Sequence, residues 1–232
     1  MVNTEVWEQL SREFAAKGVT LVAVSKTKPA ADIEALYQLG QRDFGENYVQ
    51  ELAEKHTQLP EDIRWHFIGH LQGNKVKLIA PFIHLIHTVD SFKLLVEINK
   101  QAEKNVRTID VLLQMYIATE ETKFGLDEKE ILVLLDYYEA QKEQLKNVRI
   151  CGLMGMATNT DNEQQCHAEF FKLHNFFTFL AGTSFFWKTL VFHLLYGHER
   201  RSWYCHRGGQ HHGAHRQYAV WRKEIMRLFL SV

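Results

Sequence analysis

Short apolar runs alternate with longer amphipathic stretches along most of this chain, and this alternation constrains its fold more than any other feature. The sequence predicts strands over residues 21–25, 43–46, 65–68, 85–89, 111–117 and 150–154. It predicts helices over residues 3–17, 31–39, 49–58, 74–80, 91–105, 127–144 and 161–179. Alternating strands and helices indicate βαβ units and a parallel sheet. Six strand–helix repeats followed by about 50 more residues favour an α/β fold of the (β/α)8 TIM-barrel type over an open sheet.

The chain has the length and composition of one large α/β domain. It has 232 residues, 46% of them hydrophobic, and no internal linker rich in Pro, Gly or Ser. Asp127 and Asp161 are expected helix N-caps, and Gly40 is expected to end a helix. A formal net charge of -1 gives no electrostatic reason to expect nucleic acid or an anionic membrane as partner.

The expected location is the reducing cytoplasm. No apolar run reaches the length of a membrane-spanning helix, and the first five residues lack the basic and apolar layout of a signal peptide. The three cysteines, Cys151, Cys166 and Cys205, form no pattern typical of disulfides or of a metal site.

A parallel barrel carries its chemistry at the carboxyl ends of the strands and in the loops that follow them. Polar residues fall at these places along most of the chain. They are Lys26 and Lys28, Asn47 and Tyr48, His70 and Gln72, Asp90, Glu120 and Lys123, and the segment 154–158. The sequence therefore predicts one site at the mouth of the barrel.

Lys26 is the most informative of these residues. It follows the apolar run 21–25, so its amine is expected to emerge at the barrel mouth. Partial desolvation and a nearby cation such as Lys28 both lower the pKa of an ammonium group, which makes the amine a nucleophile. Such an amine can form a Schiff base with an aldehyde cofactor. The alternative from position alone is an ordinary solvated lysine that closes a strand.

Five motifs favour the first interpretation, because together they resemble one family. They are Ala23-Val24-Ser25-Lys26-Thr27-Lys28-Pro29, Phe44-Gly45-Glu46-Asn47-Tyr48-Val49-Gln50-Glu51, Trp65-His66-Phe67-Ile68-Gly69-His70-Leu71-Gln72-Gly73-Asn74-Lys75, His87-Thr88-Val89-Asp90-Ser91 and Gly152-Leu153-Met154. In this order and spacing they are similar to the pyridoxal phosphate homeostasis protein family. The fold of that family resembles the N-terminal barrel of alanine racemase.

The resemblance implies that Lys26 is the lysine that binds pyridoxal 5′-phosphate (PLP) as a Schiff base. It further implies that Asn47, His66 and Met154 line the cofactor pocket. Each of these three also has a structural alternative: Asn47 as a turn residue, His66 as a hydrogen-bonded core histidine, and Met154 as a filler of the barrel core. Glu120, Lys123 and Gly125 match a further loop of the family, and Tyr116 stands where asparagine or histidine is more usual.

The composition changes near residue 181. Residues 181–232 hold six of the 13 histidines, three of the five tryptophans and eight of the 27 Lys and Arg residues. They hold only Glu199 and Glu224 as acids, so the front segment is net acidic and the tail net basic. We therefore treat residues 1–180 as the PLP-binding barrel and residues 181–232 as an anomalous tail.

The tail also lacks the turn that should hold the cofactor phosphate. Barrels usually bind phosphate in the loops after strands seven and eight. The family supplies a serine–methionine–glycine–methionine–serine–glycine turn and a later methionine–valine–arginine–isoleucine–glycine strand. Neither occurs here, but codons for residues 195–201 translated one base later permit the turn, and those for residues 209–223 permit the strand. The sequence thus indicates a one-base frameshift near residues 180–188.

Two other hypotheses for the tail are a histidine-rich metal site, with His206, His211, His212 and His215, and a basic RNA-binding segment. No Asp, Glu or paired Cys supports a defined metal geometry, and neither hypothesis explains the missing motifs. On the frameshift hypothesis, strands seven and eight are lost, so we expect an incomplete barrel with open sheet edges. We also expect weak PLP binding.

The resemblance implies a PLP carrier that regulates the free cofactor pool, without dedicated catalysis. The alternative is a PLP-dependent enzyme such as an amino-acid racemase, which needs a second acid/base group and a second domain around the substrate. The chain offers neither in an assignable form, so the carrier is favoured. A third hypothesis is a barrel that uses Lys26 on another carbonyl compound. The expected partners are PLP and PLP-dependent apo-enzymes, and the expected state is a monomer without a metal.

Overall fold

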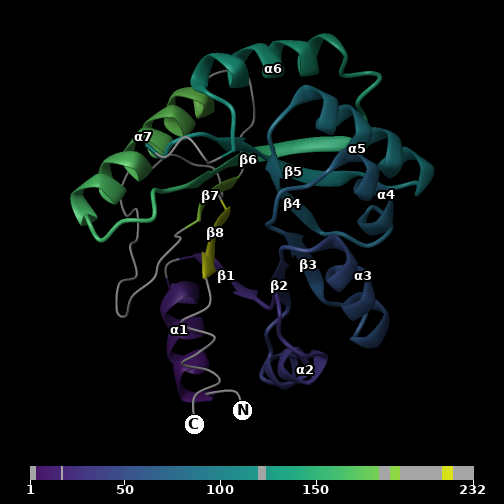
Figure 1. Ribbon diagram of the computed structural model, residues 1–232, viewed down its shortest axis with the longest axis vertical. Helices are drawn as coiled ribbons and strands as arrows, with labels where there is room; N and C mark the ends of the chain where they lie inside the picture. Colours follow the sequence, from purple (N-terminus) through teal and green to yellow (C-terminus); the bar gives the residue numbers. More distant parts are fainter. Residues whose placement is uncertain (1–3, 17, 120–123, 183–188, 194–215, 222–232) are drawn as a thin grey trace.

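The computed structural model describes residues 4–16, 18–119, 124–182, 189–193 and 216–221, the last two ranges as backbone only. The strands are β1 (Val19–Val24), β2 (Asp43–Glu46), β3 (Arg64–Phe67), β4 (Leu85–Val89), β5 (Ile109–Met115), β6 (Val148–Met156), β7 (Thr189–His193) and β8 (Arg216–Trp221). They form one closed parallel barrel in chain order, with the helices outside it (Figure 1). The predicted α/β barrel is confirmed.

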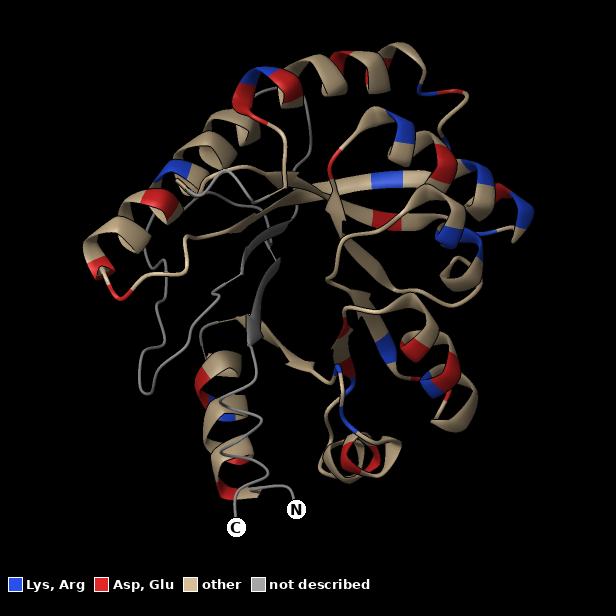
Figure 2. Cartoon of the chain, in the orientation of Figure 1, with Lys and Arg blue, Asp and Glu red and all other residues tan. Residues whose placement is uncertain are grey.

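The helices are α1 (Thr4–Ala16), α2 (Ala30–Gln38), α3 (Val49–Gln58), α4 (Val76–Ile79), α5 (Phe92–Lys104), α6 (Glu128–Ala140) and α7 (Glu163–Ala181). A short 3₁₀ helix, η1 (Gly73–Lys75), precedes α4. Charged residues of both signs are interspersed over these helices (Figure 2). No helix among the described residues is long and apolar enough to cross a membrane.

Local sequence signals explain where several helices begin and end. Asp127 caps α6 in a reciprocal capping box with Glu130, as predicted. Gly40 has a φ of 103°, which a residue with a side chain rarely adopts, and it follows the end of α2 as predicted. The predicted cap Asp161 is wrong, because the side chain of Asn162 accepts the hydrogen bond from the backbone of Gln165. Two adjacent cap-forming residues leave the start of a helix undecided by one position.

Alternating side chains along the strands divide the core in two. One buried cluster contains six strand residues and Ile68, which directly follows β3: Val22, Val24, Ile68, Leu85, Leu112, Cys151 and Met154. The other cluster contains the neighbouring strand residues, such as Ala23, Phe67 and Leu153, together with the inner faces of the helices. The first cluster therefore fills the inside of the barrel, and the second fills the layer between barrel and helices.

Strands seven and eight were expected to be missing. This expectation is wrong, because the backbone of residues 189–193 and 216–221 forms both strands. β7 pairs in parallel with β6, and β8 pairs in parallel with both β7 and β1, so the sheet has no open edge. Parallel pairing uses backbone groups, and the tail supplies residues that favour strands. These are Leu190, Val191 and Phe192 in β7, and Tyr218, Val220 and Trp221 in β8. Closure therefore does not require the family's own residues in these strands.

Candidate functional site

Lys26 lies at the carboxyl end of β1, in the turn that opens onto the barrel mouth. The backbone of Ser25 still pairs with β2, through a 2.9 Å hydrogen bond from its nitrogen to the oxygen of Gly45. A 3.1 Å bond from the nitrogen of Lys28 to the oxygen of Ser25 then closes a tight turn around Lys26 and Thr27. Lys26 is half-buried. The structure thus places Lys26 in the turn after β1, as the sequence predicts.

The residue after Lys26 has a strained backbone. Thr27 has a φ of 61°, in the left-handed region that a β-branched residue rarely adopts. Its backbone nitrogen donates a 2.6 Å hydrogen bond to Oε1 of Glu51, in the first turn of α3. Strain of this kind costs about 1–3 kcal/mol, persists only where neighbours impose it, and is concentrated at functional sites.

A buried ion-pair network underlies the turn. Nζ of Lys55 donates hydrogen bonds of 2.7 Å to Oε1 of Glu46, to Oε1 of Glu51 and to the backbone oxygen of Ser25. The hydroxyl of Ser25 donates a 2.6 Å bond to the same oxygen of Glu46. Burial raises the pKa of Glu46, although the bonds from Lys55 and Ser25 act in the opposite direction. The network fixes the backbone on both sides of Lys26.

The sequence analysis did not identify Lys55 as part of the site. Its only local signal was the spacing of Glu51 and Lys55, which are four residues apart on α3 and can form an ion pair on any exposed helix. What distinguishes Lys55 is burial: its side chain is 8% exposed and Glu46 is fully buried. Burial of that kind depends on the docking of α3 against β1 and β2, which a helix pattern does not specify.

The loops after β2 and β3 are in close contact beside this turn. Asn47 directly follows β2 and is half-buried, and Gly69 follows β3 two residues after its last residue. A methyl group on Gly69 would lie 2.2 Å from the backbone oxygen of Asn47. Only glycine permits this approach, so Gly69 sets the position of Asn47 at the mouth.

The loops after β3, β4 and β5 also meet at the mouth. The ring of His70 stacks on Phe124 with 4.6 Å between centroids, and its Nδ1 lies 3.4 Å from Oδ2 of Asp90. Glu120 and Lys123 fall outside the described residues. Gly125 has a φ of 143° and a methyl group there would lie 2.7 Å from the nitrogen of Tyr116, so the loop folds back tightly on β5.

Met154 lies inside the barrel in β6, fully buried in the cluster that includes Val24 and Ile68. Val24 lies two positions before Lys26, and Ile68 lies one position before Gly69. Met154 therefore forms part of the apolar floor under the mouth. The structure brings this residue together with the turn that carries Lys26, and its burial also matches the alternative of a core filler.

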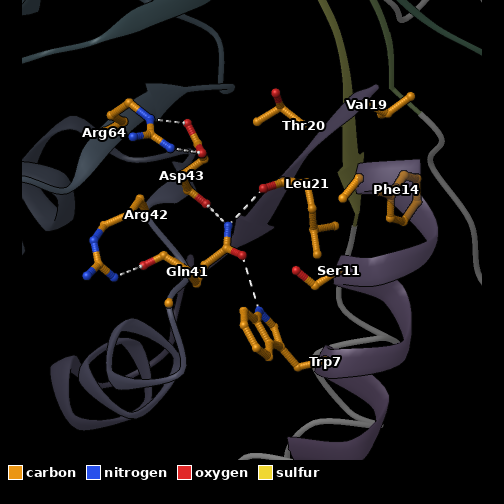
Figure 3. Close-up of a pocket in the computed structure, with 12 residues that line it drawn as sticks. Trp7, Ser11, Phe14, Val19, Thr20, Leu21, Gln41, Arg42, Asp43 and Arg64 are labelled. Carbon is orange, nitrogen blue, oxygen red and sulfur yellow. Dashed lines mark hydrogen bonds and ion pairs between the residues drawn. The ribbon is translucent and has the colours of Figure 1, made fainter. Parts of the chain in front are cut away.

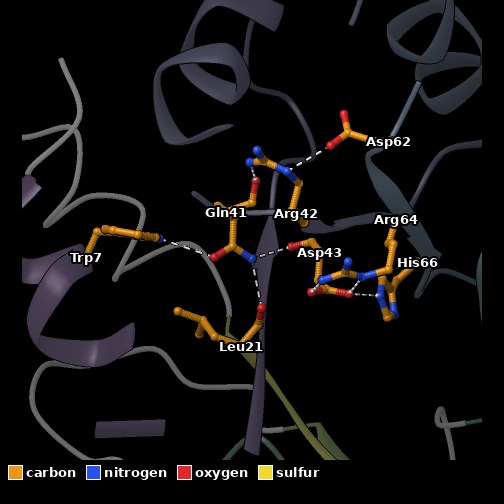
Figure 4. A network of polar contacts seen from close by, with 8 residues as sticks. All are labelled: Trp7, Leu21, Gln41, Arg42, Asp43, Asp62, Arg64 and His66. Atoms are coloured by element: carbon orange, nitrogen blue, oxygen red, sulfur yellow. Dashed lines mark hydrogen bonds and ion pairs between the residues drawn. The ribbon is translucent and has the colours of Figure 1, made fainter. Parts of the chain in front are cut away.

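His66 lies lower in the barrel, in a buried polar cluster (Figure 4). Its Nε2 is 3.1 Å from Oδ1 of Asp43, and its Nδ1 is 2.9 Å from Nε2 of His87. Arg64 donates two hydrogen bonds to Asp43, of 2.8 and 2.6 Å. Asp43 and Arg64 are the first residues of β2 and β3, so this cluster extends from the barrel interior to its amino-terminal end, away from Lys26.

Burial and neighbouring charged groups determine the charges of Asp43 and His84 in this cluster. The pKa of Asp43 is lowered to about 2, because the hydrogen bonds and charges of Arg64 and His66 outweigh the cost of burial. Burial, together with the neighbouring His66, lowers the pKa of His84 to about 4. At neutral pH, Asp43 is therefore an anion and His84 a neutral imidazole.

The segment in which the frame-shifted codons permit a phosphate-binding turn, residues 195–201, lies outside the described residues. β7 ends immediately before it, at His193. A turn that starts there would follow strand seven, which is where barrels usually bind phosphate.

Comparisons with known proteins show the family of this chain. The sequence model for the N-terminal domain of alanine racemase matches residues 5–194. The pyridoxal phosphate homeostasis protein of Haemophilus influenzae is 39% identical over 162 residues, which cover 68% of this chain and 67% of that protein. The protein of the same name from Escherichia coli K12 is 39% identical over 142 residues, 60% of this chain and 59% of that one.

Solved structures share the fold of this chain. PipY of Synechococcus elongatus, solved with PLP bound, is 28% identical and superposes with a TM-score of 0.70 over 94% of this chain and 96% of its own. The structure of PipY without PLP gives a TM-score of 0.72 at 33% identity, over 81% and 87% of the two chains. The alanine racemase of Streptomyces lavendulae shares the fold alone, at 15% identity and a TM-score of 0.65, and 51% of its chain is covered.

Proposed function

Because the chain belongs to the pyridoxal phosphate homeostasis protein family, whose fold is the N-terminal domain of alanine racemase, we propose that it binds PLP on Lys26. The proposed role is to hold this cofactor as a Schiff base and so regulate the free pool of PLP, without dedicated catalysis. The relative PipY has been solved with PLP bound, which supports the assignment of the ligand.

The observation that carries this proposal is the support around Lys26. PLP supplies an aldehyde, which condenses with a primary amine when the amine is held in reach. The turn at residues 25–28 presents one such amine at the mouth, and Lys55 and Glu51 hold the backbone on either side of it. A surface lysine that merely closes a strand would not need a buried ion-pair network and a strained neighbour.

The remaining residues fit the ring of the cofactor. Asn47 stands at the mouth beside the turn and offers amide donor and acceptor groups, while Met154 offers an apolar floor. His66, which is fully buried in β3, is proposed to line the pocket, as the family resemblance implies. These assignments to Asn47, His66 and Met154 extend the proposal from the amine to the whole pocket.

We place the phosphate in the region that the tail disturbs. The match to the family model ends at residue 194, and the frame-shifted codons permit the family's turn from residue 195 onward. The proposal therefore divides the chain into a PLP-binding barrel, residues 1–180, and an out-of-frame tail, residues 181–232. In the chain as written, the amine and the walls of the pocket are retained, but the family's phosphate donors are replaced by other residues.

The alternative function is a racemase-like PLP enzyme. Racemisation requires a second acid/base group across the cofactor from the lysine and a partner domain that encloses the substrate. This chain covers 51% of the Streptomyces lavendulae racemase, so the match is confined to the barrel half of that enzyme. The carrier function is consistent with a single barrel, which would act as a monomer in the cytoplasm and supply PLP-dependent apo-enzymes.

Two measurements test this proposal. Reduction of the PLP-loaded protein with borohydride, followed by peptide mapping, is expected to place the pyridoxyl group on Lys26, whereas a group found only on other lysines would refute the assignment. Exchange of the α-proton of alanine with solvent is expected to stay at the level of free PLP. Appreciable turnover would instead support the racemase.

A further inference from the structure

A second site lies at the opposite end of the barrel from Lys26. We infer that Asp43, His66 and His84 bind a divalent late transition-metal ion, with Zn²⁺ as the best match. Each residue offers one ligand atom, and these atoms all lie within 4.8 Å of one another. Asp43 and His84 take no part in the proposed PLP site, and His66 is the one residue assigned to both sites; the inference rests on the spacing of the ligand atoms and not on the proposed PLP function.

Three neighbouring strands hold the three ligands. Asp43 begins β2, His66 lies in β3, and His84 directly precedes β4. The backbone nitrogen of His84 donates a 2.9 Å hydrogen bond to the oxygen of Trp65, which fixes its place beside β3. Ligands on rigid strands need little reorganisation to bind an ion.

The spacing of the ligands suits a small ion. Two bonds of about 2.1 Å at a tetrahedral angle separate the ligand atoms by about 3.4 Å. Nε2 of His66 and Oδ1 of Asp43 are 3.1 Å apart. The rings of His66 and His84 meet edge to face, with 5.4 Å between centroids, and the candidate ligand atoms of the three residues all lie within 4.8 Å of one another.

The outer partners that metal ligands usually have are already present. A histidine ligand generally donates its other ring N–H to a neighbour, and a carboxylate ligand is itself hydrogen-bonded. Nδ1 of His66 lies 2.9 Å from Nε2 of His87, and Arg64 holds both oxygens of Asp43. Binding of the ion at Nε2 of His66 would fix the proton on Nδ1, where it can be donated to His87.

The types of ligand atom in Asp43, His66 and His84 favour some metal ions over others. Two imidazoles and one carboxylate are typical of Zn²⁺ with an open coordination position and of related late divalent ions, whereas Mg²⁺ and Ca²⁺ prefer oxygen ligands. The charge of Arg64, which is paired with Asp43, opposes an ion here, and the nearby carboxylate of Asp110 is itself paired with Arg149.

A cavity lies beside Asp43, one of the three ligands (Figure 3). It has a volume of about 190 Å³ and lies between α1 and the amino ends of β1 to β3, with Asp43 and Arg64 in its wall. A water molecule from this cavity can complete a three-ligand site. Occupancy would link β2, β3 and β4 at the base of the barrel and stabilise the folded chain by mass action.

The test uses Co²⁺ as a coloured substitute for Zn²⁺. Because any accessible imidazole is a ligand for late divalent ions, the full chain is prepared with His206, His211, His212 and His215 replaced by Gln. Titration with Co²⁺ is expected to give visible d–d bands at one equivalent, which Zn²⁺ removes. In this background His84→Gln is expected to weaken binding about tenfold or more. The matched control His167→Gln, on the exposed face of α7, is expected to bind like the parent.

Equal affinity in His84→Gln and the control, or no d–d bands at one equivalent, would overturn the inference. Circular dichroism checks that His84→Gln is folded. An independent readout on the unsubstituted site is the ¹⁵N spectrum of the imidazoles, where Zn²⁺ is expected to shift one nitrogen each of His66 and His84. If only other histidines shift, the inference is wrong.

Discussion

Nζ of Lys55 lies 2.7 Å from the backbone oxygen of Ser25, the residue that immediately precedes Lys26. A buried ammonium group thus holds the main chain at the point where β1 ends and the proposed cofactor lysine begins. The same group pairs with the fully buried Glu46 and with Glu51, which holds the backbone on the other side of Lys26. The network links the stability of the barrel to the geometry of the site.

Lys55→Met is expected to destabilise the protein and to weaken PLP binding. Removal of one partner from a buried ion pair costs about 3–5 kcal/mol, because Glu46 is left as an uncompensated buried charge. Unfolding in urea measures the loss. The control Lys100→Met, on the exposed face of α5, is expected to stay within about 0.5 kcal/mol of the parent. If both variants unfold at the same urea concentration, Lys55 does not have this role.

Gly69→Ala is expected to impair PLP binding by displacing Asn47. The added methyl would lie 2.2 Å from the backbone oxygen of Asn47, so one of the two loops must move. At Gly73 a methyl would meet only Cγ of Glu97, at 3.8 Å, so Gly73→Ala is a matched control. Titration with PLP compares the two, and equal affinities would show that the contact between the loops does not shape the site.

His84 is expected to make the stability of the metal-free protein depend on pH. Its pKa in the folded protein is about 4, against about 6.5 in the unfolded chain, so the unfolded chain binds more protons between these values. Stability is therefore expected to fall as the pH is lowered from 6.5 towards 4. His66, Asp43, Arg64 and Asp110 act on the same ring. The slope of melting temperature against pH is expected to be smaller in His84→Gln, and an unchanged slope would contradict the assignment.

Restoring the reading frame is expected to raise PLP affinity. The frame-corrected chain regains the serine–methionine turn, whose backbone donors can hold the phosphate. Since β7 and β8 close the barrel in the chain as written, the difference is expected in binding more than in secondary structure. Absorbance titration with PLP and circular dichroism of both chains measure these two quantities. Equal PLP occupancy would refute the frameshift account, and the nucleotide sequence of codons 175–230 would test it directly.

Local patterns in the sequence predicted the strands and helices of the front segment well. β2, β4 and α3 begin and end at the predicted residues. Closure of the barrel by β7 and β8 was not predicted. These strands were expected to be missing because the family's own sequence is absent there, whereas strand pairing is made by backbone groups. The α/β barrel class follows from the alternation alone.

The candidate site was predicted only in its position along the chain. Lys26 and Asn47 could be placed at the mouth because each directly follows a predicted strand; in the structure Lys26 lies two residues after β1 and Asn47 one residue after β2. Lys55 could not, because its partners Glu46 and Ser25 are distant in sequence and meet it only when α3 packs against the barrel. His84 gave no signal for the same reason: a single histidine before an apolar strand acquires its neighbours Asp43 and His66 from the fold.

The most direct test of the central claim is the absorbance of PLP bound to Lys26→Ala in the frame-corrected chain. The account predicts that this variant loses the visible band of the Schiff base and most of its bound cofactor. Lys28→Ala, which removes the neighbouring amine two residues later, is expected to keep both. If Lys26→Ala stays as yellow and as fully loaded as its parent, Lys26 is not the cofactor lysine and the proposed function fails.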